Sequence, residues 1–473
     1  MFFRHMHKTF PRDHWFMNHG YSPEELAADF KKVSEIVARY KARIDPSRQI
    51  STDEFVARQK KVIAGLKERG YNVGIVFSDE HYAGDVPYLA GNINISIEQI
   101  AGIIGTTGFH VVAGLEGGYV VEQLAGRSRS IVHKVEMLQL ADEKYPIAAE
   151  KLEAVIEAAA GMPLSKMKRI ALLTPRQIIP ASVVAYLERL FGKDGVVDEQ
   201  EIYYKIKYIK SDMELALIRD ASLIADAMMR AMLAVIKPGM LETEVASWAY
   251  FTASILGAEG MGFKVILGAG EANRTLIGLA LNRRIEKGDW VHLGVSPKRD
   301  GLASCVRRSI IVGTTEAEWT DNQRYWFDFI EAAYKAGFDA YVDVAKNKRP
   351  AKFQEKALVD FFKSRSKVVS ERYGKDIQLD ALKPYTGTHN AGYTECQEFY
   401  GAITLDSEGP LGEQIVTMLD VALRGIGDRW NDVIIPDLDY IVIENTLGKF
   451  GTRVECFNEL PLRVQHLIGK GIE

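Results

Sequence analysis

Hydrophobic and polar positions switch between a helical and a strand period along most of this chain. From residue 51 the amphipathic segment STDEFVARQKKVIAGLKERG precedes YNVGIVFS, whose apolar run is typical of a buried strand. Further on, apolar residues recur at steps of three and four and predict a long helix with one apolar face: Leu217, Ala221, Ile224, Met228, Met232 and Val235. Such mixed helical and strand patterns predict an α/β (α+β) protein.

The ends of this long helix are also visible in the sequence. Ser211 and Glu214 form a capping box, which satisfies the free N–H groups of a first helical turn, and Lys237-Pro238-Gly239 ends the helix. The chain has 473 residues, 47% of them hydrophobic, which is enough for two cores because single cores stop growing near ~250–300 residues. We predict a helical arm over residues 1–50, an α/β domain over 51–205 and a second domain over 206–473.

Charge and composition narrow the class of function. The net charge is −4 and no basic block is longer than a few residues, so no electrostatic surface for nucleic acid or anionic membrane is expected. No apolar run approaches the ~18 residues of a membrane span, and the N-terminus lacks the apolar core of a signal peptide. We therefore expect a cytoplasmic protein that acts on a small molecule or a peptide.

Three cysteines and a histidine-containing N-terminus are candidates for disulfide formation, catalysis or metal binding. Cys305, Cys396 and Cys456 are too few and too far apart for a disulfide scaffold, so we expect reduced thiols that serve as packing residues, nucleophiles or ligands. The first 20 residues contain four histidines without helical pairing, and we interpret this leader as a packing or interface arm.

The stretch GDWVHLGVSPKRDGLASCVRRS, residues 288–309, resembles two strands of the pita-bread family, which includes creatinase, aminopeptidase P, prolidase and methionine aminopeptidase. In that family GDxVxxDxG and GYxxDxxRT carry two aspartates eleven residues apart. Gly294 and Cys305 stand at these positions with the same separation. The segment IKSDMELALIRDASLIADAMMRAMLAVIKPGM is also similar to the family, and Glu54, Arg58 and the Tyr88-Leu-Ala-Gly91 turn resemble the N-terminal domain of creatinase and aminopeptidase P.

The resemblance implies a degraded dinuclear metal site. The other three ligand positions of the family hold His389 in TGTHNAGY, Asp420 in VTMLDVA and Glu444 in YIVIENT. Gly294 cannot coordinate, whereas Cys305, His389, Asp420 and Glu444 are four competent donors for one zinc or iron ion. A metal-free site is the alternative, because creatinase works in this fold without metal.

Two further departures argue against ordinary family chemistry. Gly278 stands where creatinase and the peptidases have an active-site histidine, and Arg307 stands where creatinase has a glutamate. These changes argue against cleavage of Xaa-Pro peptides and against hydrolysis of creatine.

Four more residues are candidates for substrate binding. His292 shares a strand face with Gly294, because side chains alternate along a strand, although such a histidine can also be a core residue. Arg307 and Arg308 alternate in the same way, so one of them faces the cavity, either as a bidentate clamp for a substrate carboxylate or as part of a salt bridge. Cys396 is either a buried packing residue or a second thiol of the pocket.

The sequence thus predicts a divergent hydrolase that acts on a C–N bond of a small, carboxylated substrate, with His389, Cys305, Asp420 and Glu444 as the catalytic residues. A Cys305 nucleophile activated by His389 is the metal-free variant of this hypothesis. An inactive binding or scaffold protein and an ordinary Xaa-Pro metallopeptidase are the other functional alternatives. The resemblance also implies a homodimer.

Overall fold

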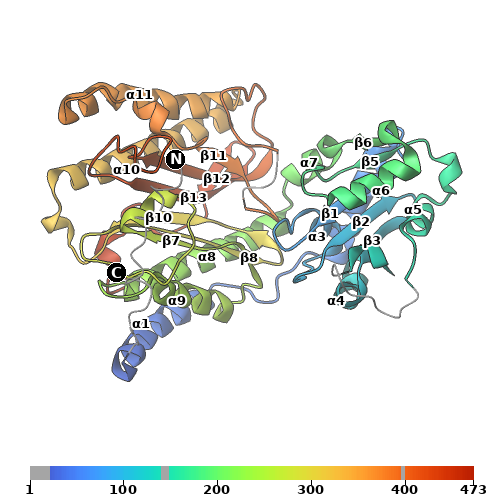
Figure 1. Ribbon diagram of the computed structural model, residues 1–473, viewed down its shortest axis with the longest axis horizontal. Helices are drawn as coiled ribbons and strands as arrows, with labels where there is room; N and C mark the ends of the chain where they lie inside the picture. The colour runs from blue at the N-terminus through green and yellow to red at the C-terminus, as the bar shows by residue number, and fades with distance from the viewer. Residues whose placement is uncertain (1–21, 140–148, 396–399, 473) are drawn as a thin grey trace, which may run out of the picture.

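The computed structural model describes residues 22–139, 149–395 and 400–472. The histidine-containing leader and Cys396 lie outside these ranges. Figure 1 shows two lobes joined by a narrow waist: the blue to green lobe holds the smaller sheet, and the green to red lobe holds the larger one. This two-part α/β architecture confirms the fold class predicted from the sequence.

The smaller lobe is built on a six-stranded sheet in the order β4-β3-β2-β1-β5-β6. Strands β1, β2 and β3 are antiparallel neighbours, whereas β4, β5 and β6 join the sheet in parallel pairs. The elements are α2 (Thr52–Glu68), β1 (Val73–Ser78), α3 (Asp85–Ala90), β2 (Ile100–Gly105), β3 (Gly108–Ala113), α4 (Leu115–Ser128), β4 (Ile131–Lys134), α5 (Leu152–Ala160), β5 (Ile170–Leu172), α6 (Ala181–Phe191), β6 (Val196–Asp198) and α7 (Gln200–Tyr208).

The larger lobe carries a second sheet in the order β11-β12-β13-β10-β8-β7, with β14 paired to β13 and β9 to β8. Its strands are β7 (Gly260–Ala269), β8 (Trp290–Arg299), β9 (Leu302–Ala303), β10 (Val306–Ile311), β11 (Thr388–Asn390), β12 (Gln414–Arg424), β13 (Tyr440–Phe450) and β14 (Arg453–Cys456). Every strand pair in this sheet is antiparallel.

Helices cover one face of the larger sheet: α8 (Asp212–Val235), α9 (Glu242–Ile255), α10 (Asp321–Asn347) and α11 (Lys352–Tyr373). The capping box predicted at Ser211 and Glu214 is present, with both reciprocal hydrogen bonds formed. Leu293 packs with the α8–α9 helices, and Leu419 and Ile443 pack with α10 and α11. Because side chains alternate along a strand, the neighbours of these residues point to the opposite face.

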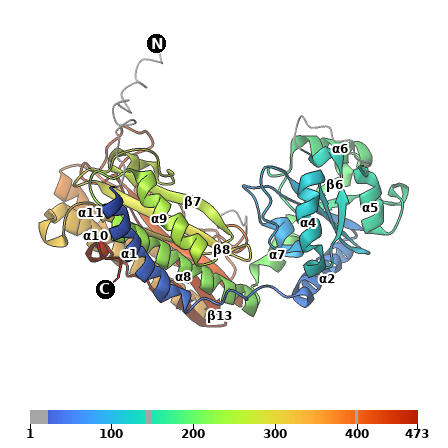
Figure 2. The same cartoon turned by 90° about the horizontal axis from the view of Figure 1, so that it is seen from below.

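Helix α1 (Pro23–Lys41) lies alongside α8 and α9 of the larger lobe, as Figure 2 shows. It contributes Val33 and Ile36 to the core that α8 and α9 share with the sheet. A capping box between Ser22 and Glu25 starts the helix. In the described part of the chain, no helix is both long enough and apolar enough to span a membrane.

A buried cluster joins the two lobes. Tyr88 of the smaller lobe meets Tyr393 edge-on, with 5.8 Å between the ring centroids, and both belong to one apolar cluster that also contains Cys305 and Met418. This cluster brings the smaller lobe against the face of the larger sheet that the helices leave uncovered. The residues with candidate chemistry lie on that same face.

Candidate functional site

Four candidate residues form one straight row across the larger sheet. Arg307 on β10 pairs with Gly294 on β8 on one side and with Glu444 on β13 on the other. Glu444 in turn pairs with Asp420 on β12. Directly opposed residues on antiparallel strands present their side chains on the same face, so this row fixes the relative position of the three charged groups.

Cys305 and His389 reach the same face from the neighbouring positions. Cys305 precedes Arg307 by two residues, and His389 on β11 pairs with Met418 on β12, two residues before Asp420. A spacing of two residues keeps a strand side chain on one face. The structure therefore brings Cys305, His389, Asp420 and Glu444 together.

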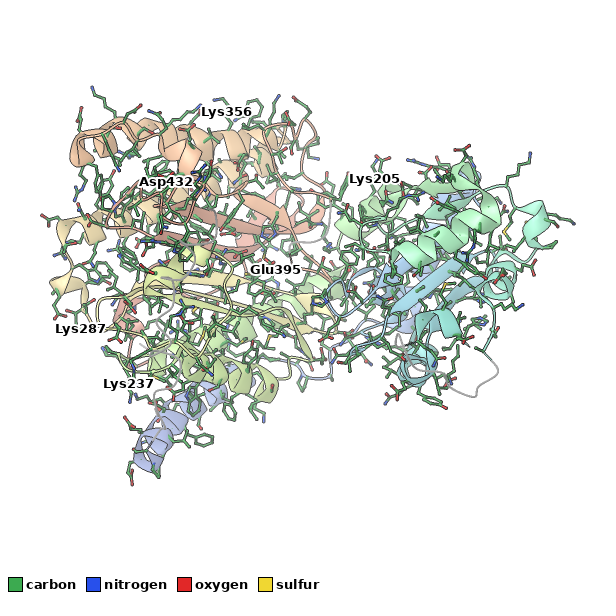
Figure 3. The ribbon with its side chains drawn as sticks, in the orientation of Figure 1. Lys205, Lys237, Lys287, Lys356, Glu395 and Asp432 are labelled. Atoms are coloured by element: carbon green, nitrogen blue, oxygen red, sulfur yellow. The ribbon has the colours of Figure 1, made fainter. Side chains whose placement is uncertain are left out.

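His389 lies between two carboxylates. Its Nε2 is 3.4 Å from Oε1 of Glu444 and 3.5 Å from Oε1 of Glu395, and its Nδ1 is 3.1 Å from the carbonyl of Asn390. Glu395 comes from the loop after β11, on the side of the larger lobe that faces the smaller one (Figure 3). The imidazole ring is thus held by its own loop on one side and by two acids on the other.

The burial of these groups shifts their proton affinities. Burial alone would lower the pKa of His389, but Glu395, Glu444 and Asp420 raise it to about 10. Burial, together with the neighbouring charge of Glu444, raises the pKa of Asp420 to about 7. Burial, Glu444 and Glu395 also raise the pKa of the Cys305 thiol well above its ordinary value. A bound cation would oppose these shifts, because metal ligands bind in their deprotonated forms.

Donors for a metal ion fall into two overlapping sets that share Glu444, one with Cys305 and Glu395 and one with His389 and Asp420. Donor atoms of Cys305, Glu395 and Glu444 lie within 4.8 Å of one another, and His389 is 3.4–3.5 Å from both glutamates. Bonds of ~2.0–2.3 Å in tetrahedral geometry place ligand atoms roughly 3.3–3.8 Å apart, so the His389 separations match ligands better than hydrogen bonds. Oε1 of Glu444 is buried and makes no hydrogen bond, which leaves it available as a ligand.

Asp420 is also within reach of His389 and Glu444, but both of its oxygens already have partners. Oδ2 accepts a hydrogen bond from Nη1 of Arg307 at 3.3 Å, and Oδ1 accepts one from the Tyr385 hydroxyl at 3.1 Å. Arg307 also donates to the Tyr385 hydroxyl at 3.0 Å and to the carbonyl of Leu276 at 2.5 Å. The half of the site next to Asp420 is therefore filled by a guanidinium group.

These contacts agree with the salt-bridge alternative for Arg307 and not with the substrate clamp. Arg307 is the one that faces the site, but its side chain is only 4% exposed and its amino groups have internal partners. Arg308 points to the other face, is completely buried, and donates to the carbonyls of residues 307, 444, 460 and 461 and to Asn445. Neither arginine is placed to hold a substrate carboxylate.

Burial also separates the alternatives for two other candidates, and His292 agrees with the core-residue interpretation. His292 shares the site face but is completely buried; its Nδ1 lies 2.6 Å from Asn273, and Tyr440 stands edge-on to its ring. Burial and Arg307 lower its pKa well below the ordinary value, so it is a neutral core residue and not a substrate contact. Cys305 is also fully buried, and burial together with Glu444 and Glu395 raises the pKa of its thiol well above the ordinary value, which disfavours the thiolate that a nucleophile requires.

Sequence reasoning missed Glu395 and Tyr385. Glu395 stands beside the candidate Cys396 in the motif TECQEF, and this adjacency was the available signal for it. Tyr385 directly precedes the TGTHNAGY motif, and no pattern in the sequence singles it out.

The fold and the family comparisons agree. A sequence model described as Metallopeptidase family M24 matches residues 216–377. The chain is similar in structure to the X-Pro aminopeptidase from Thermotoga maritima, with a TM-score of 0.65 and 16% identity over 86% of this chain and 99% of that one. The prolidase from Pyrococcus horikoshii gives a TM-score of 0.64 and 18% identity over 87% and 100%. Residues 216–377 thus match the M24 metallopeptidase family, and the chain as a whole shares the pita-bread fold of these two solved structures.

Curated relatives match a shorter part of the chain. An uncharacterized peptidase of Bacillus subtilis is 22% identical over 236 residues, which is 50% of this chain and 64% of that protein. An Xaa-Pro dipeptidase of Pyrococcus horikoshii is 24% identical over 226 residues, which is 48% and 61%. The chain thus spans less than two thirds of the length of these relatives.

Proposed function

We propose that this protein is a hydrolase that cleaves a C–N bond in a small molecule and uses one divalent transition metal ion. The observation that supports this proposal is that two largely buried donor sets share Glu444: Cys305 and Glu395 in one, and His389 and Asp420 in the other, each with its donor atoms within 4.8 Å of one another. Sulfur, nitrogen and carboxylate donors suit zinc or ferrous iron. When bound, the ion supplies Lewis-acid polarisation of the scissile group.

Asp420 is the proposed general acid and base. Asp420 is a buried carboxyl group that lies within 4.8 Å of donor atoms of both His389 and Glu444, so it borders the proposed ion and can exchange a proton with a substrate there. In this role its carboxylate takes a proton from the attacking water and returns it to the leaving nitrogen. The Tyr385 hydroxyl and the Arg307 guanidinium orient that carboxylate through one hydrogen bond to each oxygen.

The substrate class we propose is a small amide or amidine. Both candidate arginines, Arg307 and Arg308, donate hydrogen bonds to partners within the protein. Neither is therefore available to bind a substrate carboxylate, and the proposal does not include one. The alternative of an ordinary dinuclear Xaa-Pro peptidase requires a ligand at Gly294 and a histidine at Gly278, and neither side chain exists.

An inactive binding or scaffold protein is the second candidate function. The low exposure of the cluster favours it, because side chains of His389, Asp420, Glu395 and Glu444 are 16%, 7%, 6% and 1% exposed. A hydrolase with this site has to open the cluster to substrate. A scaffold does not.

Metal-depleted and metal-reloaded protein should be assayed on a panel of short peptides, small amides and guanidino compounds. The proposal expects turnover that chelation removes and that zinc or iron restores. Glu395→Gln should weaken ion binding, whereas Asp420→Asn should keep the ion and lose turnover by ~10²–10⁴-fold, the typical contribution of a general acid or base. Turnover unaffected by either variant would contradict the assignment, and ion binding without turnover on any substrate would favour the scaffold.

A further inference from the structure

The half of the site that carries Gly294 and Asp420 contains a positive charge that belongs to the chain itself. Arg307 occupies the centre of the cross-strand row, flanked by Gly294 on β8 and Glu444 on β13. Its Nη1 is 3.3 Å from Asp420, and its Nε is 3.9 Å from Glu444. The guanidinium thus lies next to the two carboxylates that remain in this row.

Gly294 and Arg307 fit together. A Cβ atom at position 294 would lie 3.1 Å from Cγ of Arg307 and 3.3 Å from Cβ of Ile266, which is closer than nearly all such contacts in proteins. The missing side chain at 294 therefore provides the space through which the arginine stem reaches the site. The absence of a side chain at Gly294 and the inward position of Arg307 therefore depend on each other.

The loop that follows β7 completes the enclosure of this guanidinium. The carbonyl of Leu276 accepts a hydrogen bond from Nη2, and Leu276 adopts a left-handed backbone conformation with φ of 59°. The Tyr440 ring lies beneath the guanidinium, with its centroid 5.5 Å from the central carbon. A charge buried to this extent is tolerated only when it is paired and hydrogen-bonded, and Arg307 meets both conditions.

We propose that the Arg307 guanidinium is a built-in substitute for a second metal ion, and that it limits this site to one ion per chain. A guanidinium fits this place because its planar set of donors can contact two carboxylates and a carbonyl at once. Arg307 is a positioning residue: it holds Asp420 in place and neutralises charge that would otherwise attract a second cation. The inference takes its one-ion baseline from the proposed function but predicts a gain in ions that does not depend on catalysis.

The test is the number of ions bound by the purified full-length chain, measured by elemental analysis after dialysis against micromolar zinc or manganese. The double variant Gly294→Asp/Arg307→Ser restores a carboxylate and removes the guanidinium together, because Gly294→Asp alone would collide with the arginine stem. It should bind one ion more than the parent. The control is Arg274→Ser, which removes another poorly exposed arginine paired with a carboxylate, at 2.6 Å from Asp439, and should leave the number of ions unchanged.

The possible results separate the two proposals. If the parent binds one ion and the double variant binds two, the inference is supported. If the parent binds none and the double variant binds one, the inference is supported but the proposed metal-dependent function is contradicted. No gain in the folded double variant, as judged by circular dichroism, overturns the inference. If the double variant does not fold, titration of the parent decides: saturation at one ion or fewer supports the inference, and a second ion bound at micromolar affinity overturns it.

Discussion

Arg58 of the smaller lobe donates a hydrogen bond from Nη1 to the hydroxyl group of Tyr393 in the larger lobe, at 2.9 Å. Tyr393 precedes Glu395 by two residues, so this contact between the lobes fixes the loop that carries one of the four proposed metal ligands. Arg58 is 3% exposed, is paired with Glu54 and with Glu214 at 3.2 Å, and lies over the Tyr88 ring at 4.4 Å. The smaller lobe therefore supports the site without supplying a ligand.

Replacement of Arg58 by methionine should weaken both the fold and the metal site. It leaves Glu214 buried without its cation, and breaking a buried ion pair costs about 3–5 kcal/mol of the free energy of unfolding. It also releases the Tyr393 hydroxyl. Urea denaturation and a zinc titration would measure the two effects. Tyr393→Phe is the matched control and should lose only ~1 kcal/mol, the worth of one hydrogen bond.

Cys305→Ser distinguishes a ligand from a packing residue. If the thiol binds the ion, cobalt-substituted parent protein should show a sulfur-to-metal charge-transfer absorption band in the near ultraviolet, and the variant should lack it. Cys456→Ser is the control, because Cys456 is also poorly exposed but contacts the carbonyl of Asn458 away from the site. A band that survives in Cys305→Ser would contradict the role of this thiol.

His389→Ala and Glu444→Gln should each abolish or greatly weaken ion binding and leave the fold nearly intact. Neither side chain packs in an apolar core, so their loss removes ligands without opening a large cavity. Elemental analysis and a thermal melt of each variant would test this. Ion content equal to that of the parent in both variants would place the metal elsewhere.

A pair of stacked histidines in the smaller lobe should make its stability depend on pH. Nδ1 of His110 is 2.9 Å from Nε2 of His133, whose Nδ1 contacts Glu150 at 2.9 Å; Thr107 contacts the other side of His110 at 2.8 Å. Burial and His133 lower the pKa of His110 to about 4. An unfolded chain binds this proton near pH 6.5, so the stabilisation is present above about pH 6.5 and is lost as the pH falls toward about 4.

Thermal melts between pH 7 and pH 4 would test this dependence. His110→Gln should flatten the fall in melting temperature over this window. His81→Gln, at an exposed histidine of the same lobe, should leave the dependence as it is in the parent. An equal fall in parent and His110→Gln would show that other groups carry the effect.

We predict a homodimer at micromolar concentration, as the family resemblance implies. Helices α1 and α9 expose apolar side chains on a neighbouring surface, with Leu26 and Phe30 about half exposed and Ile255 48% exposed. If this surface is the interface, Leu26→Ser/Phe30→Ser should give a monomer in light scattering. Ile131→Ser, at an exposed apolar position on β4, should not change the mass. A monomeric parent would rule the prediction out.

Much of the fold could be predicted because its signals are local. The capping box at Ser211, the apolar face of α8 and the buried strand β1 follow from residues a few positions apart in the sequence. The eleven-residue separation of Gly294 and Cys305 likewise supported the resemblance to the two family strands, because both residues lie on neighbouring segments joined by a short connection. These features depend on backbone periodicity, which a sequence pattern carries directly.

Which side chains occupy the site is decided by contacts between residues far apart in the sequence, and a local sequence pattern does not encode such contacts. The choice between Arg307 and Arg308 as the inward-facing residue needed the register of β10, and the role of Glu395 needed the path of the loop after β11. Tyr385 meets Asp420 across 35 positions of sequence. A prediction from family positions could name the vacated ligand site, but only the packing of the neighbouring strands indicates what fills it.

The fit between Gly294 and the Arg307 stem also couples the two positions. With the arginine in place, a Cβ at position 294 would lie 3.1 Å from its Cγ, so a side chain there requires the arginine stem to shift. Replacement of the arginine alone would leave Asp420 and Glu444 without their buried countercharge. We therefore expect substitutions at the two positions to be epistatic, each better tolerated in the presence of the other.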